Sequence, residues 1–171
     1  MGKAVILSEL DITFDALMQL VSTIDEDQFN AVPFPGSWTA GQLVKHLDRS
    51  HKGFLKMING RVIDSEREPD LLAETIKADF LDFSTKTTSP DFVLPPQANY
   101  QKTEMMLSMA KIREELCKAV ELLDLSKKCI DFEIPHYGFL TRLEAIVFVI
   151  YHTQRHNHQL KKIIRSLSEV A

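Results

Sequence analysis

Residues 141–166 read TRLEAIVFVIYHTQRHNHQLKKIIRS, and this stretch decides the fold. Thr141, with Glu144 three residues later, matches the capping box that starts many helices. On a helical wheel of about 100° per residue, apolar side chains from Ala145 onward recur along one side. The stretch therefore predicts a long amphipathic helix that begins at Thr141, ends near Ser166 and buries one face.

Three further segments show the same helical periodicity. They run from about Val5 to Ile24, from Ser37 or Thr39 to Asn59–Gly60, and from about Tyr100 to Leu125. The connection over residues 61–99 is less regular, and we expect it to be a long loop with one short helix around Leu71 to Asp79. Four amphipathic helices without a convincing set of strands predict an all-α four-helix bundle, a single domain over residues 1–171.

The composition excludes several classes of function. The 171 residues carry a net charge of −4 and no long basic block, so we expect no nucleic-acid partner. The most apolar run, residues 145–151, is too short to span a bilayer, so we expect no membrane partner. Cys117 and Cys129 form neither a disulfide framework nor a CxxC site, which suits a reducing compartment. With no secretion signal recognisable at the N-terminus, we expect a cytoplasmic protein.

The helical wheel separates the three histidines of the last segment. His152 and His156 lie about 40° apart near the middle of the apolar stripe, so both are predicted to point inward. His158 falls about 120° from His152, on the polar side with Glu144, and is predicted to face solvent. The cluster is therefore an inward pair with an outward neighbour.

A third inward histidine lies on the second segment. His46 shares its face with apolar and small residues, whereas His51 falls about 140° away and is predicted to lie on the far side. Together, His46, His152 and His156 could hold Zn²⁺, Ni²⁺ or another late first-row ion and leave a position open for water or substrate. The alternative is that all three are hydrogen-bonded core residues. The last segment lacks the glutamate of HExxH, which disfavours a zincin-type protease.

Two blocks of sequence resemble the DinB-like superfamily of metal-binding four-helix bundles, which includes the YfiT-like proteins. They are GSWTAGQLVKHLDRSHKG at residues 36–53 and GFLTRLEAIVFVIYHTQRHNHQLKKI at residues 138–163, about a quarter of the chain. In the first block His46 stands at the ligand position, and in the second the HxxxHxxQ motif begins at His152. His158 stands where the family often has glycine, a mild departure that leaves the ligand positions intact.

The resemblance implies an up-down-down-up bundle, one divalent metal ion at a three-histidine site, and a homodimer. Characterised relatives include thiol transferases that add bacillithiol, mycothiol or glutathione to electrophiles, and others are described as hydrolases. We therefore expect a metal-dependent enzyme that activates a thiol or water toward a small-molecule substrate, with a low-molecular-weight thiol as cosubstrate in the first case. The alternative is a non-catalytic metal-binding protein that acts in a stress response or by interaction.

Three residues are candidates for roles beside the metal. Gln159 could hydrogen-bond a ligand or the substrate, or act as a helix-packing amide. Arg155 could meet an anionic substrate or stay solvated, and Trp38 could pack the bundle end or touch the substrate. The 61–99 connection could set substrate specificity or be a passive cover.

Overall fold

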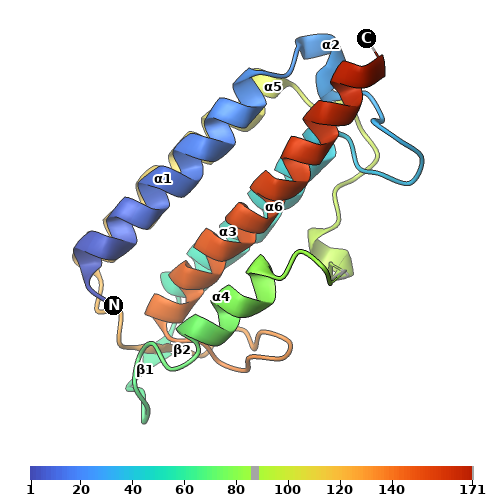
Figure 1. The fold of residues 1–171 in the computed structure, drawn as a ribbon. Helices are drawn as coiled ribbons and strands as arrows, with labels where there is room; N and C mark the ends of the chain where they lie inside the picture. The colour runs from blue at the N-terminus through green and yellow to red at the C-terminus, as the bar shows by residue number, and fades with distance from the viewer. Residues whose placement is uncertain (86–88, 171) are drawn as a thin grey trace.

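Four long helices make up most of the structure (Figure 1), a computed structural model that describes residues 1–85 and 89–170. The long helices are α1 (Lys3–Ser22), α3 (Ala40–Ile58), α5 (Lys102–Leu122) and α6 (Arg142–Val170). The shorter elements are α2 (Glu26–Phe29), β1 (Val62–Ile63), α4 (Ala73–Leu81), the 3₁₀ helix η1 (Asp91–Val93) and β2 (Lys128–Cys129).

The long helices form a ring in which α1 and α3 each contact both α5 and α6 (Figure 1). Lys3 at the start of α1 donates hydrogen bonds to the carbonyl of Glu121 near the end of α5, so these two helices are antiparallel. Arg142 at the start of α6 donates to the carbonyl of Ile58 at the end of α3, so this pair is antiparallel as well.

The central pair α3 and α5 runs in the same direction. Asn30 and Tyr100, which precede these two helices, are joined by two hydrogen bonds, from Asn30 Nδ2 to Tyr100 O and from Tyr100 N to Asn30 Oδ1. Farther along both helices, Ser108 Oγ donates to Asp48 Oδ1 at 2.5 Å. Parallel neighbours at this position give the up-down-down-up order, which confirms the expected bundle.

The start of α3 is fixed locally, and this sets the position of His46. Of the two candidate caps, Thr39 is the N-cap: its side chain accepts from Gln42 N, and Gln42 Oε1 accepts from Thr39 N, both at 3.0 Å. This reciprocal pair satisfies two otherwise free donors of the first turn. His46 follows two turns later on the face toward α6.

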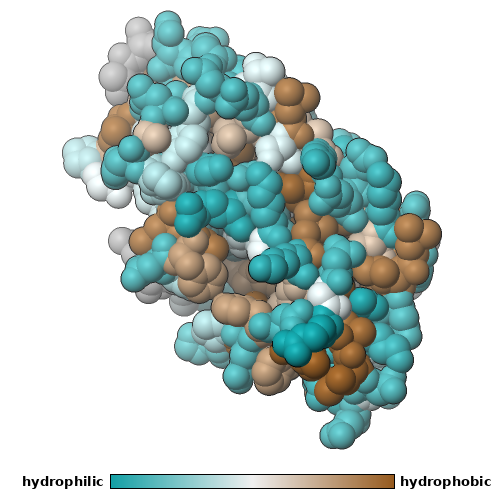
Figure 2. Space-filling model, turned by 180° about the vertical axis from the view of Figure 1, so that it is seen from behind, coloured by the Kyte–Doolittle hydropathy of each residue, from teal (hydrophilic) through white to brown (hydrophobic). Residues whose placement is uncertain are grey.

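One apolar core runs along the bundle. Its largest fully buried side chains are Ile6, Leu10, Phe14, Leu17, Ile24, Phe29, Leu43, Leu47, Ile58, Ile76, Met109 and Leu116. Hydrophobic side chains also reach the surface, and Figure 2 shows several of them around a hollow on the face opposite to the view of Figure 1. In the described part of the chain, no helix is both long and apolar enough to cross a bilayer.

The long connection between α3 and α5 is more structured than a loop with one helix. The predicted short helix is present as α4, which packs along α6, and a strand precedes it and a 3₁₀ helix follows it. The strands were not expected: β1 pairs antiparallel with β2, so that Val62 faces Cys129 and Ile63 faces Lys128. This two-residue ladder joins the connection to the loop before α6 at the end of the bundle (Figure 1).

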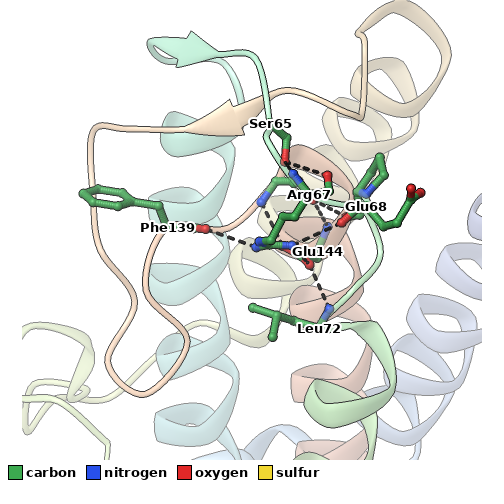
Figure 3. Close-up of polar contacts among 8 residues, drawn as sticks. Ser65, Arg67, Glu68, Leu72, Phe139 and Glu144 are labelled. Atoms are coloured by element: carbon green, nitrogen blue, oxygen red, sulfur yellow. Dashed lines mark hydrogen bonds and ion pairs between the residues drawn. The ribbon is translucent and has the colours of Figure 1, made fainter.

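Glu144 is buried, which corrects the expectation that it lies on the polar side of its helix. It completes the capping box, because Oε2 accepts from Thr141 N at 3.0 Å and Thr141 Oγ1 accepts from Glu144 N at 3.1 Å. The helical-wheel prediction failed because the α3–α5 connection covers this turn of α6 (Figure 3). Leu72 N donates to Glu144 Oε1 at 2.9 Å, and Arg67 donates to both carboxylate oxygens at 2.5 and 2.7 Å. One carboxylate therefore holds the start of α6 and the segment before α4 together.

We expect Glu144→Gln to lower the free energy of unfolding by about 3 kcal/mol, because it leaves Arg67 facing a neutral amide in a partly buried site. Urea denaturation of the two proteins measures the change. The matched control is Glu114→Gln, which breaks the exposed ion pair between Glu114 and Lys118 and should leave stability unchanged. Equal stability of the two variants would show that the buried network does not hold the connection in place.

Candidate metal centre

Three imidazole rings converge between α3 and α6. His46 Nε2 lies 3.2 Å from His152 Nε2, and His156 Nε2 lies 3.0 Å from the same atom. All three side chains are buried, at 1%, 8% and 7% exposure. Within the described residues these histidines form the one group of three or more ligating side chains whose ligand atoms lie within 4.8 Å of one another. The structure thus brings together the three residues that the sequence selected.

The hydrogen bonds behind the rings fix where the ring protons are. His46 Nδ1 lies 3.0 Å from the Val93 carbonyl, and His156 Nδ1 lies 3.0 Å from Gln159 Oε1. Both partners are acceptors, so each Nδ1 carries the proton and each Nε2 presents a lone pair to the centre. His152 has one proton if neutral and can donate to only one of the two facing Nε2 atoms. At least one of the lone pairs at the centre is therefore left without a donor.

Burial keeps these rings neutral. Desolvation lowers the pKa of His46, lowers that of His152 well below its usual value, and lowers that of His156 to about 3. The neighbouring imidazoles lower the pKa values of His152 and His156 further, because a charged ring would repel a second one. Neutral imidazole is the form that binds metal ions.

The three nitrogens fit one divalent ion. A tetrahedral ion with metal–nitrogen distances of about 2.0–2.1 Å separates its nitrogen ligands by about 3.4 Å, close to the distances found. A cation at this point would also compensate the facing lone pairs. His46, His152 and His156 would hold the ion, and three protein ligands leave room for an external one.

Gln159 lies where the sequence placed it, one turn after His156, with its amide oxygen bonded to the ligand-position ring. A bond of this kind orients a metal-binding imidazole and raises its basicity. Val93 serves the same purpose for His46 from η1, and the sequence analysis missed it. A backbone carbonyl has no residue-type signature, so no signal in the sequence could have identified it.

Trp38 and Arg155 are both close to the centre but differ in what they contact. The Trp38 ring is half-buried and its centroid lies 5.1 Å from that of His46. Arg155 lines the cleft and is not fully solvated. Its guanidinium donates to the carbonyls of Phe80 and Asp82 at 3.1 and 2.9 Å and to that of Thr85 at 2.5 Å. Arg155 therefore ties the segment after α4 to α6.

The prediction that His51 lies on the far side is wrong, because His51 is completely buried behind the centre. Its ring centroid is 5.8 Å from that of His152, and its Nε2 donates to Thr153 Oγ1 at 2.8 Å. Thr153 uses its own proton on the Val149 carbonyl, which fixes the direction of that bond. Among the described residues, neither His51 Nδ1 nor His152 Nδ1 has a hydrogen-bond partner.

His158 is not one of the converging rings, as expected, but it is not fully solvated. Its ring stacks on Phe83 with centroids 4.0 Å apart and an interplanar angle of 11°. The segment after α4 therefore covers a side chain that the helical wheel assigned to solvent.

The centre opens into a cleft of about 1460 Å³. Its lining includes His46, His152 and His156 together with side chains from α3, α6, residues 83–85 and 89–94, and the loop before α6. A pocket of this size can hold a small molecule next to a metal ion.

Comparison with known proteins identifies the family and the fold of the chain. The sequence model of the DinB superfamily matches residues 9–160. YuaE of Bacillus subtilis (strain 168), an uncharacterized protein, is 27% identical over 149 residues, which cover 82% of this chain and 85% of YuaE.

Two solved structures share the fold, each with a TM-score of 0.59 and 16% identity. One is TT2238, a four-helix bundle protein, and the match covers 94% of this chain and 99% of that chain. The other is YfiT from Bacillus subtilis, described as a probable metal-dependent hydrolase with an unusual four-helix bundle topology, with 97% and 87% covered. The family match spans most of the sequence, and residues 9–160 include all three converging histidines. The chain therefore belongs to the DinB superfamily.

Proposed function

We propose that the chain is a metal-dependent enzyme in which His46, His152 and His156 hold one divalent ion, Zn²⁺ or Ni²⁺. The observation that carries the proposal is the convergence of three buried Nε2 atoms, at least two of which present lone pairs. Buried lone pairs that have neither a donor nor a cation as a partner cost free energy. The description of YfiT as a probable metal-dependent hydrolase supports the same assignment.

The chemistry proposed is activation of a thiol or water for attack on a small molecule. A bound divalent ion lowers the pKa of a thiol or water at its open position. In the thiol case, the thiol would give its proton to solvent water and its sulfur would form a bond to an electrophilic carbon, whose leaving group would depart with the electron pair. The chain's part is to orient the imidazoles through Gln159 and Val93 and to hold the substrate in the cleft beside them.

The metal test uses the purified full-length protein and titration with Zn²⁺ and with Ni²⁺. We expect one ion per chain, and we expect His46→Ala to weaken the affinity by at least about 100-fold, because one of three ligands is lost. His158→Ala is the matched control: His158 lies two residues from His156 but stacks on Phe83 and is not one of the three converging histidines, so the affinity should not change. An unchanged metal affinity in His46→Ala would show that His46 is not a ligand. If the unaltered protein binds neither ion, the proposal is wrong.

We expect Gln159→Leu to weaken metal affinity about tenfold, because His156 loses the acceptor that orients its ring. The control is Gln154→Leu on the same helix, whose amide bonds to Thr13 and to none of the three rings. Metal titration followed by calorimetry compares the two variants. An equal affinity for both would mean that Gln159 is only a packing amide.

Turnover separates the possible reactions. We expect metal-loaded protein to join a low-molecular-weight thiol to a model electrophile, or to hydrolyse a model ester, and metal-free protein to do neither. A panel of thiols with the electrophile, run beside a panel of esters, measures both rates. Stoichiometric metal binding with no turnover in either panel would instead identify a non-catalytic metal-binding protein.

A further inference from the structure

Aromatic side chains are concentrated along the cleft that contains the metal centre. Seven of the ten phenylalanines of the chain line it. On one side, Phe148 stacks on Phe54 with ring centroids 4.5 Å apart and meets Phe80 edge to face at 4.7 Å. The Phe148 ring also lies 5.7 Å from that of His152. The aromatic wall therefore reaches the three histidines.

Other phenylalanines of the lining are open to solvent. The exposed fractions are 46% for Phe34, 43% for Phe83, 58% for Phe92 and 43% for Phe132. Phe92 in η1 and Phe132 in the loop before α6 meet edge to face, with centroids 5.7 Å apart. Exposed apolar side chains gathered around one depression mark a binding site, since burial in the core does not require them there (Figure 2).

The same cleft carries positive charge, although the chain as a whole has a net charge of −4. Arg49, Lys56, Arg155 and Lys162 line it. Over residues 1–85 and 89–170, none of the four forms an ion pair with a carboxylate. The two guanidinium groups donate to main-chain carbonyls, which leave the charge in place.

The acidic side chains of the lining do not balance these cations. Asp131 is already paired with Arg61 outside the lining, at 2.6 Å. Asp79 accepts a hydrogen bond from the Tyr137 hydroxyl at 2.7 Å, and Asp91 is the third carboxylate. Four cations against these three acids, one of them neutralised, give the cleft a positive excess.

We infer that the substrate of this site is an organic anion with an apolar ring, an inference that rests on the proposed function. The ring lies against the phenylalanine wall and fills the space beside the three histidines, because stacked and edge-on rings bind a planar apolar group best. The acidic group lies toward the cations of the lining, with Lys162 on α6 the nearest in sequence to Gln159. The cleft volume of about 1460 Å³ also leaves room for a second small molecule, as a thiol transfer needs.

Three probes test the two parts of this ligand separately. They are 2-naphthoate, which has ring and charge, naphthalen-2-ylmethanol, which has the ring alone, and acetate, which has the charge alone. Calorimetry with the full-length protein, zinc-loaded and metal-free, gives the affinities. We expect 2-naphthoate to bind at least about tenfold more tightly than either of the others, because only it uses the aromatic wall and the cations together.

Matched variants locate the binding. Phe132→Ala should weaken the affinity for 2-naphthoate about fivefold. Phe139→Ala removes a ring of similar exposure (41%) outside the lining and should leave this affinity unchanged. Lys162→Ala should weaken the affinity for 2-naphthoate about threefold and leave the affinity for the neutral alcohol unchanged. Its exposed neighbour Lys161 does not line the cleft, so Lys161→Ala should change neither.

The outcomes distinguish this inference from the proposed function. If zinc binds at the three histidines but 2-naphthoate binds no more tightly than acetate or the alcohol, the substrate class is wrong and the metal assignment stands. If Phe139→Ala weakens the affinity for 2-naphthoate as much as Phe132→Ala, or Lys161→Ala as much as Lys162→Ala, the ligand lies elsewhere and the inference is also overturned. If 2-naphthoate binds as expected but no metal binds, the proposed function is wrong, and the inference that the cleft binds an aromatic anion stands.

Discussion

The need to satisfy buried imidazole nitrogens governs this structure. Three buried rings enter the bundle beside an apolar core, and each brings a donor and an acceptor that need partners. Two of the donors are satisfied by Val93 and Gln159, which turns the remaining lone pairs toward one point. The arrangement is therefore polar at its centre and apolar around it, and a cation at that point would complete it.

The connection between α3 and α5 is the second part of the site. It supplies the carbonyl behind His46 and the carbonyls that hold Arg155, and through Arg67 it reaches the start of α6. Each of these contacts joins a bundle helix to a segment that lacks long helices of its own. The connection is thus a wall of the cleft held at several points, in contrast to a loop that only links two helices.

Helical periodicity predicted the bundle, the capping box of α6 and the inward direction of three histidines, because these depend on local spacing. It failed where a helix is covered on more than one side. His51 is buried because α3 contacts both α5 and α6, and Glu144 is buried because the connection lies over it. The wheel assumes one buried face, so tertiary contacts of this kind cannot be deduced from it. The role of Val93 was out of reach for a different reason, since its carbonyl is common to every residue type.

The bond from His46 to the Val93 carbonyl has a thermodynamic consequence. The same imidazole belongs to the group of three histidines and contacts η1, which lines the cleft. Binding free energies linked in this way are reciprocal: a molecule in the cleft that stabilises the contact between η1 and His46 would raise the affinity of the three histidines for an ion, and the ion would raise the affinity for that molecule by the same factor. The affinity for an ion would then depend on what occupies the cleft.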